Sequence, residues 1–350
     1  MSQINYIIGI GRSGTSLLMS LLGSHPEILT PPENYFSVFF AHSFSKKNHF
    51  SKEDIALIDR FNIAFGKLQP YVGFQYQLPE SMRLNGFNGN YMELCKEIYS
   101  SFQHDSFQDK TPTLFIDKNP SNTLFLPGIN KMNPNARYIL MLRDYRGNIL
   151  SRKESIHLLS PNIAFNAIRW SYFTQKAMSW KKKYPKQVLL LRYEDLVENP
   201  ENCLTKVFTF LGVNPFLSEE LQRKERLAYE SYKNGDSTGT SERAKKKYED
   251  LAQPIFHHRV EKWRENLNQE EIKTAEAFCS NLGSEFGYIP TQRLSKTSSF
   301  LIRLKYLFLQ IKLFFTFQKD HLFYYLPIQY KVSRFEQYVN QIDEKRKSNS

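Results

Sequence analysis

The feature that most constrains the fold is a glycine-rich loop near the N-terminus, between a strand-like run and a helix-like run. Residues 4–10 form an apolar run of β-branched and aromatic side chains, and residues 15–22 are rich in helix formers and stop near Gly23. Between them lies Gly9-Ile10-Gly11-Arg12-Ser13-Gly14-Thr15-Ser16. Glycines let backbone N–H groups wrap an anion, and the helix N-terminus adds a favourable dipole. The sequence therefore predicts a phosphate-binding strand–loop–helix unit.

The glycine spacing fits the dinucleotide-binding pattern GxGxxG at Gly9, Gly11 and Gly14. In that pattern an acidic residue at the end of a second strand binds the ribose, and Glu33 lies at a suitable distance along the chain. Three prolines within residues 26–32 precede Glu33, however, and proline is rare inside strands. We therefore expect no strand there, which argues against a dinucleotide site.

The same loop fits most of the Walker A pattern, GxxxxGK[ST], because Gly9 and Gly14 have the required separation. Position 15 is threonine, where the pattern requires the lysine that reaches the β- and γ-phosphates. A kinase or ATPase would therefore lack its main cation. A glycine turn that binds no ligand is a third interpretation, and the loop alone does not decide among the three.

Further strand-like runs follow the loop at intervals. Residues 114–116, 137–142 and 188–191 are short apolar runs, each followed by helix-like sequence. Residues 200–211 predict a helix that ends at Gly212. Strands that alternate with helices favour a mainly parallel sheet covered on both faces.

The composition fits a folded protein with an anionic partner. Of the 350 residues, 41% are hydrophobic, which is enough to bury a large core. Lys and Arg outnumber Asp and Glu by 47 to 35, which suits a nucleotide, a nucleic acid or an acidic membrane surface. The three cysteines, Cys95, Cys203 and Cys279, are too far apart to indicate a disulfide framework or a zinc site. We expect a reducing compartment and no bound metal.

The order of several short motifs resembles that of a known enzyme family. The segment Gly11-Arg12-Ser13-Gly14-Thr15-Ser16-Leu17-Leu18 resembles the 5′-phosphosulfate loop of sulfotransferases of the carbohydrate and tyrosylprotein kind, which use PAPS (3′-phosphoadenosine 5′-phosphosulfate). Segments similar to those of the family follow in the same order: His25-Pro26, Glu33, Asp117-Lys118-Asn119-Pro120, Arg137 to Ser151, Leu191 to Leu196, Pro200 and Phe210-Leu211-Gly212-Val213. The resemblance covers residues 4–290.

The resemblance implies the fold and the reaction. The fold is α/β, a central parallel sheet flanked by helices and related in layout to the P-loop kinases. The reaction moves a sulfuryl group from PAPS to an acceptor hydroxyl or amine and leaves PAP. An aromatic-rich insertion between Asn34 and Phe107 is expected to form the acceptor cleft.

The resemblance also implies a binding site for PAPS. Its residues are Gly11, Arg12, Ser13, Gly14, Thr15, Ser16, Arg143, Ser151 and Arg259. The loop amides and the Arg12 side chain would hold the 5′-phosphosulfate. Arg143 and Ser151 would hold the 3′-phosphate, because arginine donates two N–H bonds to a phosphate and serine adds a neutral donor. Arg259 would be a second contact of that phosphate. The alternatives are a salt bridge from Arg143 to Asp144 or to another acid, and an ordinary surface hydroxyl at Ser151.

Three catalytic residues are implied by the same resemblance: Arg12, Lys118 and Glu33. Sulfuryl transfer requires stabilised charge and an acceptor that loses its proton, and it requires no metal. Lys118 would stabilise the leaving phosphate oxygen, and Glu33 would be the base. In the alternative, Glu33 caps a helix that begins near Asn34. Other candidates for the base are His104, His257 and His258.

The expected acceptor is a sugar hydroxyl of a glycan or glycolipid, with a peptide tyrosine as the second choice. Nucleic acid is not an expected partner. A nucleotide-binding kinase-like protein, or a PAP-binding protein without activity, is the alternative from another functional class. The N-terminus shows no export signal. Because Golgi members of the family carry a membrane anchor there, we expect a cytoplasmic, bacterial enzyme.

The chain divides into a sulfotransferase domain, residues 1–290, and a helical, basic and aromatic extension, residues 291–350. Residues 300–326 are dense in Phe, Leu, Ile and Tyr but are interrupted by Arg303, Lys305, Lys312 and Lys319. No uncharged apolar run reaches the roughly 18 residues of a spanning helix. The segment is expected either to pack on the main domain or to contact a membrane surface.

Overall fold

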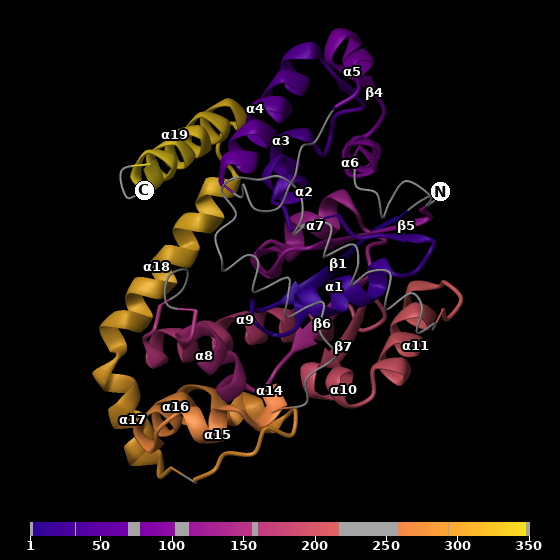
Figure 1. The fold of residues 1–350 in the computed structure, drawn as a ribbon. Coiled ribbons are helices and arrows are strands. Elements are labelled where there is room, and N and C mark those ends of the chain that lie inside the picture. The colour runs from indigo at the N-terminus through magenta and orange to yellow at the C-terminus, as the bar shows by residue number, and fades with distance from the viewer. Residues whose placement is uncertain are drawn as a thin grey trace.

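The computed structural model of the chain describes residues 3–31, 33–68, 78–101, 112–155, 160–216, 258–292 and 294–347. At its centre lies a five-stranded sheet, in which all strands are parallel and follow the order β2-β5-β1-β6-β7. The strands are β1 (Gln3–Gly9), β2 (Ile28–Leu29), β5 (Leu114–Lys118), β6 (Tyr138–Leu142) and β7 (Val188–Arg192). Helices flank this sheet (Figure 1), and the predicted α/β architecture is confirmed.

The short strand β2 corrects one expectation from the sequence. Prolines around residues 26–32 argued against a strand, yet Ile28 and Leu29 pair with Leu114 and Phe115 of β5. The strand is only two residues long and lies between Pro26 and Pro31 at the edge of the sheet, so no proline has to donate an N–H to the ladder. It ends at Leu29, before Glu33, so the acidic residue does not close this strand as a dinucleotide site requires.

Alternate residues of β1 enter separate hydrophobic cores, as the period of two in a strand requires. Ile7 packs with α1 (Thr15–Gly23), α10 (Tyr193–Glu198) and α11 (Pro200–Leu211) on one face. Tyr6 and Ile8 pack with η3 (Pro120–Leu124), α7 (Leu126–Met132) and α9 (Ile163–Lys183) on the other. Because both faces are buried, polar chemistry is confined to the strand ends.

Helix α11 shows how local sequence sets the ends of an element. Pro200 occupies the first turn, where its missing N–H costs nothing, and the side chain of Asn199 accepts a hydrogen bond from the N–H of Asn202 at 3.1 Å. At the other end Gly212 adopts φ 78°, the left-handed conformation that glycine permits. The helix predicted over residues 200–211 is confirmed.

The aromatic insertion after Asn34 forms a helical layer. It contains α2 (Phe36–Phe39), α3 (Ala41–Phe44), α4 (Lys52–Leu68), α5 (Glu80–Asn85), α6 (Tyr91–Ser100) and the antiparallel pair β3 (His49–Phe50) and β4 (Phe87–Asn88). Most of its large aromatic side chains are buried against one another: Phe36, Phe40, Phe44, Phe50, Phe61, Tyr91 and Tyr99. These side chains form the core of the insertion, and the acceptor cleft expected from this segment stays a prediction.

The remaining helices cover the other end of the sheet and the outer edge. Beside the sheet lie α8 (Tyr145–Lys153), α14 (His258–Glu261), α15 (Trp263–Asn266) and α16 (Gln269–Ser284). The C-terminal helices are α17 (Lys296–Lys305), α18 (Leu307–Tyr324) and α19 (Ile328–Lys347), which run along the outside of the molecule (Figure 1). Helix α19 packs on α4, where Arg60 pairs with Glu336 at 2.5 Å. The extension therefore contributes to the packing of the main domain.

Lys331 of α19 joins the extension to the insertion. Its amine is buried and donates to the backbone carbonyls of Phe39 and Tyr324, the latter at 3.2 Å. Burial lowers the pKa of Lys331 from 10.5 to about 8. Between these two pH values the folded protein binds fewer protons than the unfolded chain, so folding becomes more favourable as the pH rises.

We therefore expect the free energy of unfolding to include a component that rises from about pH 8 to about pH 10.5, measured by urea denaturation. Lys331→Met should remove this component. Lys319→Met, at an exposed lysine of α18, is the control and should retain it. The same pH dependence in Lys331→Met and the unmodified protein would contradict the assignment.

Candidate functional site

The glycine-rich loop lies where the sheet topology changes direction. The chain leaves β1 toward β2 and β5 on one side and later returns to β6 on the other. Ligands of open α/β sheets bind at this point, outside the carboxyl ends of the strands. The first N–H groups of α1 have no acceptor within the helix, so the loop and helix start present donors to an anion.

Three residues of the loop have a left-handed backbone, Gly9 (φ 128°), Arg12 (φ 74°) and Gly14 (φ 85°). A side chain at Gly14 would collide with the ring of Tyr193, and one at Gly9 would collide with the carbonyl of Met141 in β6. The glycines at 9 and 14 are therefore required by close packing as well as by backbone conformation. Arg12 adopts this conformation although it carries a side chain, which places strain in the loop.

Helix α8 holds the loop from one side. The side-chain amide of Asn148 donates to the carbonyl of Gly11 and to the hydroxyl of Ser13, both at 3.0 Å. One turn later the hydroxyl of Ser151 accepts a hydrogen bond from Nε of Arg12 at 3.0 Å. Two predicted site residues, Arg12 and Ser151, are thus in contact, although the sequence analysis assigned them to different phosphate groups.

Arg143 lies directly after β6 and reaches under the loop. Its guanidinium donates to the carbonyl of Arg12 at 3.1 Å and to the carbonyl of Arg259 at 3.0 Å, and it lies 4.4 Å from the ring centre of Tyr193. Its side chain is buried, its Nε has no hydrogen-bond partner among the described residues, and burial lowers the pKa of Arg143. Arg143 therefore joins the backbone of the loop to that of α14, and the charge of Arg259 lies close enough to influence its guanidinium.

The expected alternative for Arg143, a salt bridge to Asp144, is wrong. Asp144 pairs instead with Arg146. Nη2 of Arg146 lies 2.6 Å from Oδ2 of Asp144, and Nε of Arg146 lies 2.9 Å from Oδ1. Arg146 is further held by the carbonyl of Ile289 at 3.0 Å and by the face of Trp263, 4.0 Å away. The acid next to Arg143 in sequence thus stabilises the start of α8.

Lys118 and Glu33 meet at the end of β5. The amine of Lys118, which is 1% exposed, donates to Oε2 of Glu33 and, at 3.3 Å, to the hydroxyl of Ser16 in the loop. A buried ammonium requires such partners because it has lost its water. The predicted leaving-group cation and the predicted base are therefore ion-paired at the edge of the loop.

The residue after Glu33 bonds to the first turn of α2. The side chain of Asn34, the next residue, accepts the hydrogen bond from the N–H of Phe36 at 3.0 Å. Glu33 faces Lys118 instead. Of the competing bases, His104 and His257 lie outside the described residues, as does the side chain of His258 at the start of α14.

The buried acid Asp117 positions this end of the site. It precedes Lys118 in β5 and points to the opposite face, where it accepts hydrogen bonds from the hydroxyls of Ser37 at 2.5 Å and Tyr99 at 2.6 Å. Burial raises the pKa of Asp117. Because Ser37 lies in α2, this contact fixes the helix that follows Glu33.

Arg152 and Asn148 are site residues that the sequence reasoning missed. They lie one turn apart on α8, and Nη1 of Arg152 lies close to Gly11 of the loop. Nε of Arg152 donates to Asn166 at 2.8 Å, and burial, with Arg169 and Arg12 nearby, lowers its pKa to about 10. The sequence could have indicated them, because residues four apart lie on the same face of a helix, and that face also carries Ser151 close by.

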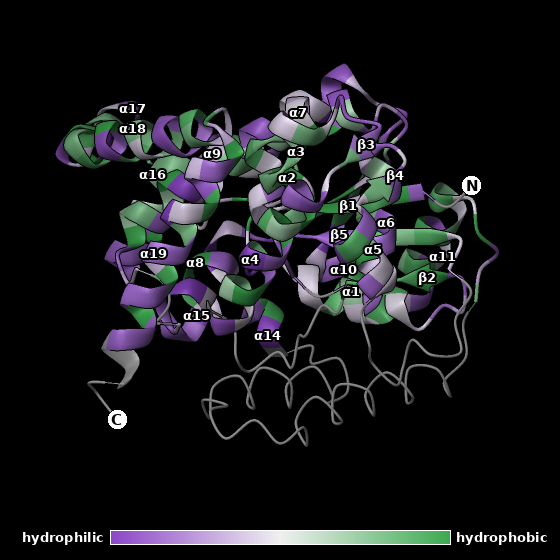
Figure 2. Cartoon of the chain, turned by 90° about the horizontal axis from the view of Figure 1, so that it is seen from above, coloured by the Kyte–Doolittle hydropathy of each residue, from purple (hydrophilic) through white to green (hydrophobic). Residues whose placement is uncertain are grey.

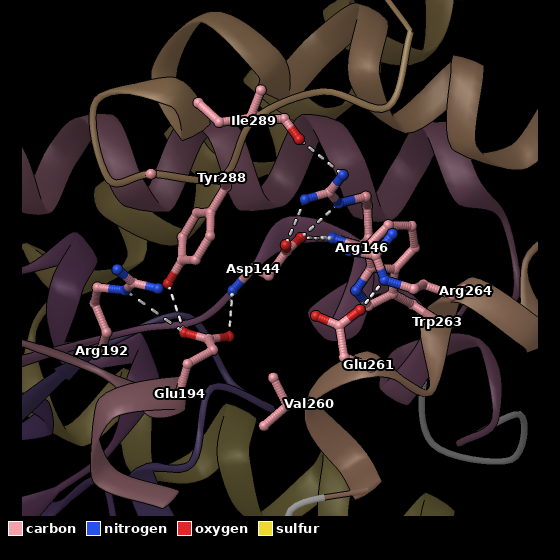
Figure 3. Close-up of a pocket in the computed structure, with 11 residues that line it drawn as sticks. Asp144, Arg146, Arg192, Glu194, Val260, Glu261, Trp263, Arg264, Tyr288 and Ile289 are labelled. Carbon is pink, nitrogen blue, oxygen red and sulfur yellow. Dashed lines mark hydrogen bonds and ion pairs between the residues drawn. The ribbon is translucent and has the colours of Figure 1, made fainter. Parts of the chain in front are cut away.

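A separate polar cavity of about 220 Å³ lies beyond β6 and β7 (Figure 3). Arg192, Glu194 and Tyr288 occupy one side of it, and the hydroxyl of Tyr288 donates to Glu194 at 2.8 Å. Asp144 and Arg146 occupy the other side. The lining contains three acids and three arginines, most of them paired with each other, and none of the predicted site residues. The cavity is thus distinct from the loop site.

The described residues contain no group of three His, Cys, Asp or Glu side chains placed to hold a metal ion. The cationic groups of the site, Arg12, Arg143, Arg152 and Lys118, supply its positive charge. Such a site can bind an anionic ligand with two separate charged groups.

Comparisons with known proteins bear on the same residues. The family model described as "Sulfotransferase family" matches residues 6–217. A putative protein-tyrosine sulfotransferase of Caenorhabditis briggsae is 23% identical over 221 residues, which cover 60% of this chain and 66% of that protein. The nodulation protein NoeE of Sinorhizobium fredii is 23% identical over 310 residues, which cover 81% of this chain and 66% of that protein. The chain thus spans 66% of the length of each of these relatives.

A solved structure shares the fold. The sulfotransferase domain of the olefin synthase from Synechococcus PCC 7002 matches with a TM-score of 0.51 and 19% sequence identity, over 84% of this chain and 98% of that domain. At this identity the similarity concerns the fold alone. It supports the P-loop-kinase-like arrangement of the sheet and the loop.

The loop conformation gives a testable prediction. Gly14→Ala should lower the melting temperature and abolish anion binding, because the new Cβ meets Tyr193 and the left-handed backbone adds about 1–2 kcal/mol of strain. Gly11→Ala is the matched control for stability, since its Cβ would have ordinary contacts at 3.8–3.9 Å. Calorimetric melting of both variants measures the difference. Equal melting temperatures would refute the assigned loop geometry.

Proposed function

Because this chain belongs to the sulfotransferase family, we propose that it transfers a sulfuryl group from PAPS to an acceptor hydroxyl or amine. One observation carries the proposal: a buried arginine, Arg143, lies at a strand end beside a glycine loop and a helix N-terminus. PAPS differs from ATP in its 3′-phosphate, so its enzyme needs a second anion site besides the one that holds the 5′-phosphosulfate. Arg143 supplies a cation for that second site.

The residues of the site fit PAPS. The amides from Ser13 to Ser16 and the Arg12 side chain would hold the 5′-phosphosulfate. Arg143, Ser151 and Arg259 would hold the 3′-phosphate. The Nε of Arg143 has no hydrogen-bond partner within the part of the chain that the structure describes, which fits a site whose positive charge is not yet fully compensated. When bound, PAPS supplies the activated sulfuryl group.

The chain's own residues have separate tasks in this scheme. Lys118, fixed by Glu33 and Ser16, provides positive charge where the leaving phosphate oxygen develops negative charge. The carboxylate of Glu33 accepts the proton of the attacking acceptor. Its side chain is 32% exposed, in contrast to buried Lys118, so an acceptor can reach it from solvent.

For the acceptor, we propose a sugar hydroxyl of a glycan or glycolipid first. A peptide tyrosine is the second candidate, favoured by the name of the Caenorhabditis briggsae relative, putative protein-tyrosine sulfotransferase. The compartment we propose is the cytoplasm. Support comes from Cys95, Cys203 and Cys279, which are all free and buried, as is usual in a reducing environment.

The donor proposal predicts a preference for PAP over ADP. A charge-assisted phosphate contact contributes about 1.5–3 kcal/mol, so PAP should bind roughly 10- to 150-fold more tightly than ADP in isothermal titration. Ser151→Ala should reduce this preference, and Arg143→Met should abolish it. Ser155→Ala is the control, because the hydroxyl of Ser155, two residues beyond α8, donates to the backbone carbonyl of Ser151 at 2.8 Å.

The control should keep the full preference for PAP. Equal affinity for PAP and ADP in the unmodified protein would rule out the donor. If Ser155→Ala also lost the preference for PAP, the reduced preference of Ser151→Ala would reflect a change at the end of α8 and not the loss of the Ser151 hydroxyl.

The catalytic roles predict kinetic effects that differ between two variants. Glu33→Gln keeps the shape but removes the base, so kcat should fall by about 10²–10⁴ while PAP affinity barely changes. Lys118→Ala should also reduce kcat, because the leaving oxygen loses its cation. Raising the pH should partly rescue Glu33→Gln and not Lys118→Ala. Turnover is measured as release of PAP. The acceptor is an oligosaccharide or a tyrosine peptide, depending on which of the two the unmodified protein sulfates.

Glu27→Gln, a carboxylate outside the loop that accepts a hydrogen bond from Thr113 at 3.0 Å, is the control and should keep normal turnover. Normal turnover in Glu33→Gln together with a lower melting temperature would make Glu33 a structural residue. The base would then be sought among His104, His257 and His258.

A further inference from the structure

Helix α18 has an apolar face that points away from the protein. Its exposed apolar side chains are Leu307, Phe308, Ile311, Phe314, Phe315 and Leu322. Their spacing of three, four and seven residues places them on one stripe of the helix. Phe308 is 79% exposed and Phe315 is 65% exposed, values that are rare for phenylalanine in a soluble protein.

The opposite face of α18 performs the packing. Leu313, Phe317 and Tyr324 are buried, and the ring of Phe317 stacks on Tyr172 with centroids 4.5 Å apart. The helix therefore has two apolar faces, of which one joins the core. The outer face is not needed to hold α18 in place.

The exposed stripe continues into the preceding helix. In α17 the side chains of Phe300, Leu301 and Leu304 are exposed, at 51–61% each. Helices α17 and α18 run end to end along one side of the molecule (Figure 1), and both carry extensive hydrophobic colouring in the view from above (Figure 2). The apolar surface thus extends over two helices, more than the scattered exposed residues of ordinary surfaces.

The charged residues beside this surface are mainly cations. Between Lys296 and Lys319 the sequence contains five of them and no Asp or Glu: Lys296, Arg303, Lys305, Lys312 and Lys319. The acid of α18, Asp320, interacts with Arg169 of α9, which packs on the inner face of the helix. Lys312 and Lys319 are exposed, and the helical repeat places both along the edge of the apolar stripe. Long lysine side chains beside an apolar surface can extend their amines to anionic groups at its boundary.

We propose that the outer face of α17 and α18 lies on a membrane surface that contains anionic lipids. Apolar side chains flanked by cations match the acyl boundary and the charged headgroups of such a surface. A second copy of the chain fits less well, because a two-fold contact would bring this cationic face against itself. Within the described chain no helix is both long and apolar enough to cross a bilayer, so the helices lie in the interface.

The test is flotation of the full-length protein with vesicles of phosphatidylcholine containing 30% phosphatidylserine, compared with phosphatidylcholine alone. We expect binding to the anionic vesicles that weakens as salt increases. Phe308→Ser combined with Phe315→Ser should reduce the fraction of protein bound to vesicles by at least about tenfold, since two aromatic side chains that would insert into the membrane are lost. Ile63→Ser combined with Leu84→Ser is the matched control, because these exposed apolar residues lie on α4 and α5.

The variants separate the outcomes. Lys312→Glu combined with Lys319→Glu should abolish the preference for anionic vesicles. Melting temperature and PAP affinity should stay normal in every variant, because none of these residues contacts the core or the loop site. Equal binding of the Phe308/Phe315 variant and the control variant overturns the proposal. A dimer of the unmodified protein that dissociates in the Phe308/Phe315 variant, without vesicle binding, also overturns it and assigns the face to a second copy.

Discussion

The central position of β1 is the constraint on which the rest of the site depends. β1 pairs with β5 on one side and β6 on the other, and helices bury both faces of the sheet. Polar side chains can therefore meet a ligand only at the carboxyl ends of the strands. This places the loop, Lys118 and Arg143 at one edge, although they are far apart in the sequence.

Helix α8 converts this shared edge into a rigid cationic site. Asn148 and Ser151 fix the loop, while Arg152 adds a buried guanidinium beside it. Burial lowers the pKa of Arg143 and of Arg152, because a charged guanidinium loses hydration there. The protein holds these charges in place through hydrogen bonds to backbone carbonyls and side-chain amides, so the anionic ligand that we propose would meet a site that is already organised.

The C-terminal helices combine two roles on opposite faces. The inner face of α18 completes a core with α9, and Lys331 of α19 binds carbonyl groups of α2 and α18. The outer face stays apolar and cationic. Removal of the whole extension would therefore expose the core, which is why substitutions on the outer face separate surface contacts from stability.

The sequence by itself determined those secondary-structure elements that depend on residues close together along the chain. The strand–loop–helix unit, four of the five sheet strands and the helix end at Gly212 follow from patterns of neighbouring residues. The tertiary structure alone decided that two residues become β2, that the aromatic insertion forms a core, and that Glu33 pairs with Lys118, 85 residues away. These features depend on which segments the sheet brings together, because pairing and burial are properties of neighbours in space and not of neighbours along the chain.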